Sequence, residues 1–359
     1  MNAVRDRCAL AILLIVVNFP GLTAEWFPLE VDVWKPPFNE RLERVSENYV
    51  PLVKASQHWK ICASIPHLKD AYWIAVNFGL VDEAKRLGVR LRINAAGGYD
   101  QLDVQRKQIA DCMDSGADGL IVSGISADGV NDLVEGYLAE GKPVIDLINS
   151  ISASGLTARA AVTFWDNGYQ AGELLKQLTG GAEVQVLWLP GPKGAGWSQA
   201  GDQGFREAID GSEIEIVSTE WGDTGRAVQA RLIEHALDRH PDIGFIAGTA
   251  VSAEAAVDVL RRRDLSQQVG VLAYYYGPGV HSAIRRGRIA GAPTDKQGLQ
   301  ARLAMDIIVR ALEGEPFLRH VGPKVEVVTR ASMGSFDATT SIPPKGFRPV
   351  FSVDDWVDR

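Results

Sequence analysis

The chain has 359 residues, of which 46% are hydrophobic and 23% are charged, and its formal net charge is −8. This length suits two domains of ordinary size, each able to bury its own core. The acidic balance argues against nucleic acid as a partner, because such a partner needs a basic patch and the run Arg261–Arg263 is more typical of a solvated helix end.

The first residues have the pattern of a secretory signal peptide. Arg5 and Arg7 precede the apolar run 8–17, which is too short to span a bilayer. Cleavage is expected after Ala24, which makes residues 1–24 the signal peptide. No later stretch reaches transmembrane length, so we expect a mature protein exported to the periplasm without direct membrane insertion.

Residues 25–59 do not follow the pattern of the rest of the chain. They contain Trp26, Trp34 and Trp59, which are expected to pin this segment to the body as an N-terminal strap. A partner-binding surface is the alternative interpretation. The C-terminal tail, residues 346–359, is expected to be a similar strap or a frayed end.

From residue 60 onward, short apolar strands alternate with amphipathic helices. The first half contains the expected strands Lys60–Ile65, Arg90–Ala95, Gly119–Ser123 and Pro143–Ile148, separated by the expected helices Asp70–Leu87, Leu102–Ser115 and Asp128–Ala139. The second half contains the expected strands Val184–Leu189, Glu215–Thr219, Ile243–Ala247 and Val269–Ala273, with helices between them. This alternation predicts an α/β protein with two doubly wound parallel-sheet lobes around a central cleft.

Two cysteines, Cys62 and Cys112, remain after the signal peptide. Cys62 lies in the first expected strand and Cys112 near the end of the second expected helix. In a 2-1-3 strand order that helix crosses over the first strand, so the two side chains can face each other. A disulfide and two separate buried thiols both remain open.

Aromatic residues follow the expected strands at several points. Tyr72 and Trp73 follow the first strand, Tyr99 follows the second, and the run Tyr274–Tyr276 follows the last. In open α/β sheets, ligands bind beyond the carboxyl ends of the strands. Aromatic faces at that place suit a small methylated ammonium or N-oxide group.

Catalysis and metal binding find little support in the sequence. The six His residues show no metal-ligand spacing, and no nucleophile elbow is present. The glycine-rich stretch 190–197 lacks the Gly-Lys-Ser/Thr ending of a phosphate loop. We therefore expect no catalytic residues, no metal and no cofactor, and an enzyme is disfavoured.

Several loop motifs occur in the order found in a known family. They are Ala117–Ser123, Asp166–Gly172, Gln203–Ala208, His240–Phe245 and Arg286–Gly291. Together, over about residues 58–335, they resemble the ribose-type (type I) periplasmic binding proteins. The resemblance implies three crossings between lobes, with residues 60–162 plus 291–320 in the N-terminal lobe and residues 163–290 plus 321–345 in the C-terminal lobe.

The departures from that family concern the sugar site. The family's sugar binders place an Asp where this chain has Tyr275, and an Asn-Asp pair where it has Thr249 and Ala250. Sugar hydroxyls left unpaired in a closed site cost several kcal/mol. A sugar is therefore disfavoured as the ligand.

A narrower resemblance concerns the sensors of trimethylamine N-oxide within this family. It is carried by residues 30–38, 66–73, 96–99 and Trp165. It implies a periplasmic sensor that binds trimethylamine N-oxide and signals to the periplasmic domain of a membrane sensor histidine kinase in a two-component system. The alternative is the substrate-binding protein of an ABC transporter for a small quaternary ammonium solute or a sugar.

Candidate ligand contacts follow from the resemblance and the strand ends. Tyr72 and Trp73 occupy the loop where sugar binders stack a Phe pair, and core packing is the alternative for both. Tyr99 lies on a Gly-Gly loop that lets it lean into the cleft. Trp165 lies at the crossing into the second lobe.

The remaining candidates are less clearly placed. Tyr275 leads the tyrosine run, and Tyr276 is kept as a candidate although strand alternation sends neighbours to opposite faces. His67 can donate to the ligand oxygen or act in loop packing. Trp197 can approach the cleft from its glycine-rich loop or belong to the core.

Overall fold

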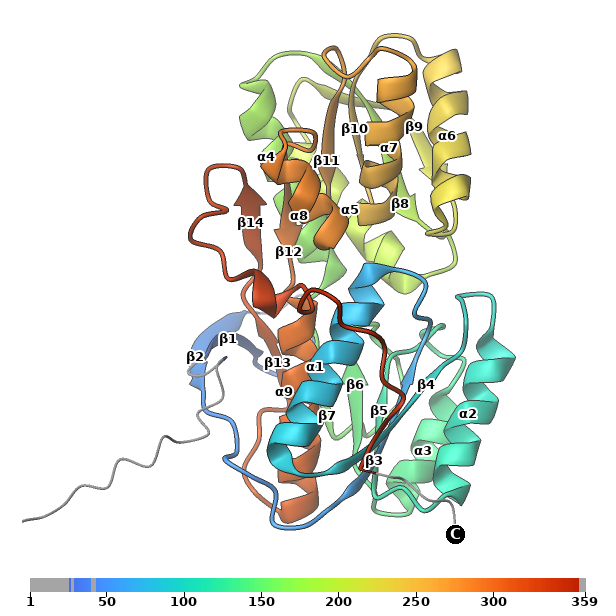
Figure 1. The fold of residues 1–359 in the computed structure, drawn as a ribbon, viewed down its shortest axis with the longest axis vertical. Coiled ribbons are helices and arrows are strands. Elements are labelled where there is room, and N and C mark those ends of the chain that lie inside the picture. The colour runs from blue at the N-terminus through green and yellow to red at the C-terminus, as the bar shows by residue number, and fades with distance from the viewer. Residues whose placement is uncertain (1–25, 27–28, 40–42, 355–359) are drawn as a thin grey trace, which may run out of the picture.

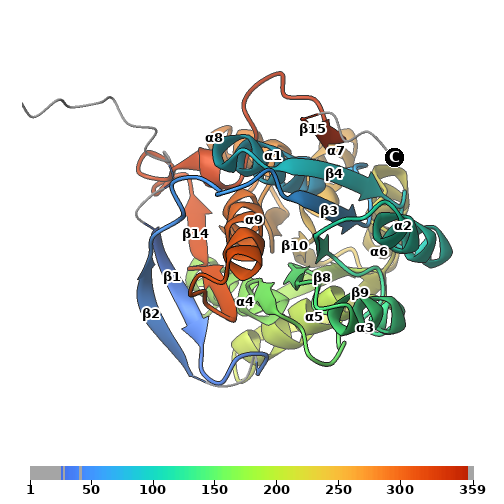
Figure 2. The same cartoon turned by 90° about the horizontal axis from the view of Figure 1, so that it is seen from below.

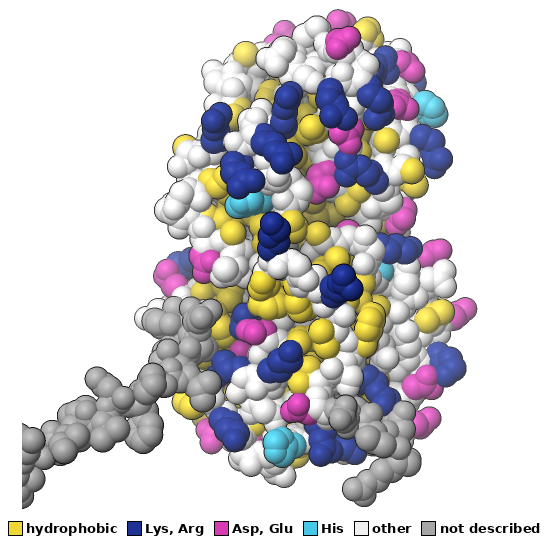
Figure 3. Space-filling model, in the orientation of Figure 1, with side chains coloured by type: hydrophobic (Ala, Val, Ile, Leu, Met, Phe, Trp, Pro, Cys, Tyr) yellow, Lys and Arg dark blue, Asp and Glu magenta, His cyan; other side chains and the backbone are white. Residues whose placement is uncertain are grey.

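The computed structural model describes Trp26, residues 29–39 and residues 43–354. The expected signal peptide lies outside the described residues. Two α/β lobes are stacked along the long axis of the molecule, and we call them the lower and the upper lobe as they stand in Figure 1. Figure 3 shows the same face as a space-filling view, with Lys and Arg side chains spread over both lobes. The predicted class, two doubly wound lobes around a cleft, is confirmed.

The lower lobe is built on a nine-stranded sheet in the order β15-β4-β3-β5-β6-β7-β13-β1-β2. Its strands are β1 (Leu29–Trp34), β2 (Arg44–Tyr49), β3 (Lys60–Ile65), β4 (Arg90–Ala95), β5 (Gly119–Val122), β6 (Val144–Leu147), β7 (Ala158–Ala160), β13 (His320–Pro323) and β15 (Ser352–Val353). The order β4-β3-β5 is the expected 2-1-3 arrangement. Figure 2 shows α1 (Ala71–Leu87) and α9 (Gln297–Glu313) on one side of this sheet, and α2 (Leu102–Asp114) and α3 (Asn131–Ala139) on the other.

Local sequence explains where these elements begin and end. The residues of β3 from Ile61 to Ile65 are all buried, as a strand covered by helices on both faces requires. Helix α1 begins after Asp70, whose side chain accepts a hydrogen bond from the backbone N–H of Trp73. It ends at Gly88, whose φ of 77° is the left-handed conformation that favours glycine.

The upper lobe is built on a four-stranded parallel sheet in the order β11-β10-β8-β9. Its strands are β8 (Val184–Gly191), β9 (Ile214–Trp221), β10 (Ile243–Gly248) and β11 (Gly270–Ala273), and its helices are α4 (Phe164–Thr179), α5 (Gly196–Ile209), α6 (Arg226–Arg239), α7 (Ala250–Arg262) and α8 (Pro278–Arg285). Helices α4 and α5 touch through their backbones, since a Cβ on Gly204 would lie 2.1 Å from the carbonyl oxygen of Trp165. The start of α4, next to the cleft, is capped by Thr163, whose side chain accepts a hydrogen bond from the backbone N–H of Asp166.

The chain passes between the lobes after β7, and again through β12 (Gly291–Thr294) and β14 (Glu326–Thr329). β12 and β14 pair antiparallel as a separate two-stranded sheet between the lobes (Figure 1). The chain then returns over the lower lobe, where β15 pairs antiparallel with β4. The described part of the C-terminal tail is therefore fastened to the lower lobe.

The N-terminal segment forms a β-hairpin that extends the lower sheet. β1 pairs with β2 and also with β13, both antiparallel. Trp34 is buried and stacks on His320 with their ring centroids 4.2 Å apart. Arg44 reaches the upper lobe, where its guanidinium binds both carboxylate oxygens of Asp166 at 2.6 and 3.0 Å.

Cys62 and Cys112 form a disulfide, which decides between the two alternatives that the sequence left open. Both residues are fully buried, and 50 positions separate them. The bond joins β3 to α2, so it fastens a helix to an interior strand of the lower sheet.

Candidate ligand-binding site

A cavity lies between the lobes, beyond the carboxyl ends of strands from both sheets. It holds about 280 Å³ of free space, part of it open to solvent. Six of the nine residues that line it are aromatic. The lower lobe contributes Asp70, Tyr72, Trp73, Tyr99 and Asn149, and the upper lobe contributes Phe164, Trp197, Thr224 and Tyr275.

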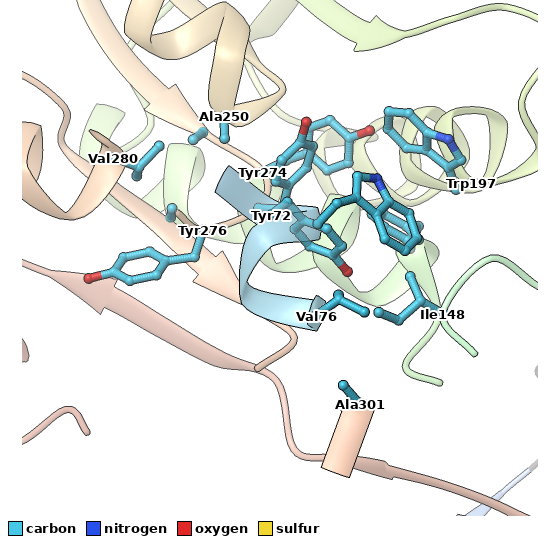
Figure 4. Packing of buried hydrophobic residues seen from close by; sticks show 14 of the residues in the cluster. Tyr72, Val76, Ile148, Trp197, Ala250, Tyr274, Tyr276, Val280 and Ala301 are labelled. Atoms are coloured by element: carbon cyan, nitrogen blue, oxygen red, sulfur yellow. The ribbon is translucent and has the colours of Figure 1, made fainter. Parts of the chain in front are cut away.

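The aromatic rings touch one another across the cleft. Tyr72 meets Tyr275 edge to face with the centroids 5.4 Å apart, and Tyr99 lies 5.9 Å from Trp197. Phe164 joins the two groups through Trp197 at 5.3 Å. Figure 4 shows Tyr72 and Trp197 as part of this packed group. The lobes are thus in contact around the cavity, and we call these six rings the aromatic cage.

Hydrogen-bond donors are available within the cage. The hydroxyl of Tyr99 accepts a bond of 3.1 Å from the side-chain amide of Asn149, which leaves its own proton free to be donated. Burial raises the pKa of Tyr99, so that proton stays in place at neutral pH. The buried indole N–H of Trp197 has no hydrogen-bond partner within the described part of the chain.

The charged groups near the cavity are carboxyls. Asp70 lines it while capping α1, and burial raises its pKa. The hydroxyl of Tyr72 donates to the carboxylate of Asp295, which lies behind the cage at the N-terminal side of α9. A cavity with aromatic walls, neutral donors and nearby carboxylates can bind a small group that has a cationic methyl face and an accepting oxygen.

Five of the residues predicted from the sequence line the cavity: Tyr72, Trp73, Tyr99, Trp197 and Tyr275. The structure places His67 behind them, where its ring meets Tyr99 edge-on at 5.4 Å. Burial lowers the pKa of His67, and its Nδ1 accepts a hydrogen bond from the backbone of Lys69. His67 therefore takes the position expected for its alternative role, packing within the loop, and does not line the cavity.

Two predicted residues lie elsewhere. Trp165 stacks on Tyr169 at 4.8 Å and donates its indole N–H to Glu207, so its ring follows the outside of α4. Tyr276 binds His281 through its hydroxyl and packs on Phe336, and Figure 4 shows it directed away from Trp197. Its neighbour Tyr275 lines the cavity. Both tyrosines lie beyond the end of β11 at Ala273, so their directions are set by the loop and not by strand alternation.

Sequence reasoning missed three lining residues, Phe164, Asn149 and Thr224. Phe164 precedes Trp165, and because α4 begins there, the first residue rather than the second enters the cavity. Asn149 directly follows the strand region at the end of β6, which is the place where ligand residues are expected. Asp70, the first residue of the expected helix Asp70–Leu87, was not among the predicted ligand contacts either, and it both caps α1 and lines the cavity.

Within the described ranges, no group of three or more His, Cys, Asp or Glu side chains is arranged to hold a metal ion. The same part of the chain contains no helix that is long and apolar enough to cross a membrane.

A protein family and a named protein match this chain over most of its length. The family described as "Periplasmic binding protein domain" matches residues 61–316. The periplasmic protein TorT of Escherichia coli K12 is 38% identical over 299 residues, covering 83% of this chain and 86% of TorT.

Two solved structures add to this. The solute-binding protein of an ABC transporter from Bradyrhizobium sp. BTAi1, with bound Bis-Tris, has 45% sequence identity and a TM-score of 0.83, and covers 92% of this chain and 99% of that one. The complex of the TorS sensor domain with TorT in the presence of TMAO (trimethylamine N-oxide) matches with 31% identity and a TM-score of 0.76, covering 82% of this chain and 99% of that one.

Proposed function

The chain belongs to the periplasmic binding protein family with the type I fold, and from this premise we propose that it is a periplasmic sensor of trimethylamine N-oxide. It binds this ligand in the aromatic cage and signals to the periplasmic domain of a membrane sensor histidine kinase. It performs no chemical reaction on the ligand. The mature protein is exported by the signal peptide of residues 1–24.

The aromatic cage is the observation that carries this proposal. Trimethylamine N-oxide has a cationic methyl face and a strongly accepting oxygen. The rings of Tyr72, Phe164 and Tyr275 suit the methyl face, and the hydroxyl of Tyr99 and the indole N–H of Trp197 suit the oxygen. A neutral N-oxide leaves no net charge to be compensated in this buried place.

The signalling part of the proposal rests on the likeness to TorT, which has been solved in complex with the TorS sensor domain. Ligand that touches both walls of the cavity favours the arrangement in which the lobes meet. A kinase domain that contacts both lobes would sense the resulting change in their relative position.

Calorimetric titration of residues 25–359 with trimethylamine N-oxide tests the ligand. A ligand of about five non-hydrogen atoms gains at most roughly −7.5 kcal/mol, so the dissociation constant should be no tighter than a few micromolar. Tyr275→Ala should weaken binding about tenfold, because one desolvated ring face is lost. The matched control is Tyr276→Ala, which removes the neighbouring ring outside the cavity and should leave the affinity unchanged.

A second candidate function is solute delivery to an ABC transporter. The Bradyrhizobium relative, at 45% identity, holds Bis-Tris, a tertiary amine, and Asp70 in the wall of the cavity suits such a cation. Titration with choline and betaine separates the two candidates on the ligand side. Binding of a kinase ectodomain to the liganded protein separates them on the partner side, since a transport protein has no such partner.

A further inference from the structure

Behind the aromatic cage lies a buried hydrogen-bonded pair, Tyr72 and Asp295. The Tyr72 hydroxyl donates to Asp295 Oδ2 over 2.5 Å, while the ring of Tyr72 lines the cavity. Asp295 itself is not a lining residue and is only 1% exposed. The pair therefore connects a carboxylate that the ligand does not touch with a ring that it does.

Among the residues that the structure describes, no cationic side chain pairs with Asp295 to offset its charge. Its other polar contacts come from Gln300, whose side-chain amide donates to Oδ2 at 2.7 Å and to the backbone carbonyl at 2.8 Å. Oδ1 is buried without a hydrogen-bond partner, and Asp295 forms no ion pair within the described part of the chain. Burial raises the pKa of this carboxyl, and the hydrogen bonds from Tyr72 and Gln300 act in the opposite direction.

A second pair of the same type shows what is unusual about this one. The hydroxyl of Tyr49 donates to Asp306 over 2.5 Å, also in a buried place. There, however, Arg310 binds the same carboxylate at 2.7 Å and Arg86 lies 3.9 Å from it. The charge of Asp306 is therefore largely neutralised inside the protein, and that of Asp295 is not.

Two electrostatic effects of Asp295 reach the cavity. A phenol that donates a hydrogen bond to a carboxylate becomes more electron-rich, which strengthens the attraction of its ring face for a cation. The charge also acts directly through an environment of low dielectric constant, where screening by water is weak. Both effects favour a positive group against the ring of Tyr72.

We infer that Asp295 is a residue that determines ligand specificity without touching the ligand: through Tyr72, it makes the cage prefer a cationic methyl face over a neutral group of the same shape. This inference rests on the proposed function. The position of Asp295 is fixed from the hinge, because Gln300, which holds it, also accepts a hydrogen bond from the backbone N–H of Val162 at the first crossing. The carboxylate of Asp295 is therefore linked to the cage through Tyr72 and, through Gln300, to the crossing after β7. Asp295 itself directly follows β12, a second connection between the lobes.

The test compares trimethylamine N-oxide with tert-butyl alcohol, a neutral molecule of nearly the same shape, by calorimetry and by competition. D295N keeps the size of the side chain and removes its charge. We expect it to weaken N-oxide binding by about threefold to tenfold, the range of a single cation–π contact, and to leave the alcohol unaffected. Y72F keeps the ring and removes the hydrogen bond, so it should cause a similar loss, and the double variant should lose little more than either single one.

Y49F is the matched control, since it breaks the other buried Tyr–Asp pair, neither member of which lines the cavity. It should leave the N-oxide affinity unchanged. Unchanged affinity in D295N and Y72F, or an equal loss for the N-oxide and the alcohol, would overturn the inference, the latter because a merely structural role weakens both ligands. A wild-type protein that binds no N-oxide would overturn the proposed function itself, which separates the two failures.

Discussion

The two lobes share one βα scheme, but they are secured very differently. The lower sheet is extended by the N-terminal hairpin on one edge and by β15 on the other, and a disulfide joins its interior strand β3 to α2. The upper lobe has a four-stranded sheet and no cysteine, and packing, hydrogen bonds and ion pairs such as Arg262–Glu234 hold its helices together. Each lobe nevertheless contributes three of the six rings of the aromatic cage.

This difference indicates a division of roles. The lower lobe, which we call the frame, holds Tyr72, Trp73 and Tyr99 on the more heavily cross-linked side of the cavity. We therefore expect the upper lobe to be the part that moves when the cleft opens. Arg44 of the N-terminal hairpin forms an ion pair with Asp166, and this pair links the frame to the upper lobe. Three changes test this comparison, and each should act on one lobe or on the contact between them.

The largest effect is expected from the disulfide. Replacing Cys62 and Cys112 by Ala should lower the free energy of unfolding of the lower lobe by about 4 kcal/mol, because the unfolded chain is no longer cross-linked over a 50-residue separation. Hydrogen exchange followed by mass spectrometry would locate the loss. Equal loosening of both lobes would contradict the idea of a separately braced frame. Reducing agent should have no further effect on the double variant, which serves as its control.

A smaller effect is expected at the contact between hairpin and upper lobe. Arg44→Met keeps the apolar stem but leaves the carboxylate of Asp166 without its guanidinium, which should cost about 2 kcal/mol, as for hydrogen bonds to charged groups. It should also increase the open population of the lobes, measurable by small-angle scattering without ligand. Lys35→Met is the matched control: it removes the exposed pair with Glu47 in the same hairpin and should change stability by less than about 0.5 kcal/mol.

The smallest effect expected is a loss of folding stability as the pH falls. Burial, with Arg159 and Arg44 nearby, lowers the pKa of His320 to about 3, well below its value in the unfolded chain. The neutral ring accepts a hydrogen bond from the backbone of Phe38, so its contribution is present above pH 6.5 and is lost as the pH falls from there toward 3. Between pH 7.5 and pH 5.5 the hairpin should lose about 1 kcal/mol of stability.

Thermal melting at both pH values, with hydrogen exchange in β1, would measure this loss. His320→Asn has no titrating ring, and its melting temperature should vary less with pH than that of the wild type. An identical pH dependence in the variant would assign the acid sensitivity to other groups.

Much of the fold could be predicted from the sequence, since local signals mark its boundaries. Lys60–Ile65 and Arg90–Ala95 are strands with the expected ends, because apolar runs between polar turns leave little choice of register. The hairpin could not be predicted in this way. Its pairing with β13 joins residues such as Val31 and Pro323, which no local pattern connects.

The sequence predicted part of the cavity lining. Strand ends indicated Tyr72, Tyr99 and Tyr275, and these three residues line one cavity, since the carboxyl ends of parallel strands meet at one edge. The choice between Phe164 and Trp165 depends on the residue at which α4 begins. The sequence carries a signal for that start in Thr163, whose side chain caps α4 by accepting a hydrogen bond from the backbone N–H of Asp166. Which of the first two side chains faces the cavity depends in addition on how α4 packs against α5, and no local pattern gives that packing.

The returning tail has a consequence for how this molecule can be handled. The backbone of Val350 is clamped by Asn77 on α1 through two hydrogen bonds, of 2.8 and 2.9 Å, and Phe347 packs against Phe78. The described chain therefore starts and finishes on the lower lobe, and the upper lobe is an insertion within it. A tether or fluorophore attached at either end would therefore be attached to the lower lobe. It should not restrict movement of the upper lobe, so closure of the lobes should remain measurable in immobilised protein.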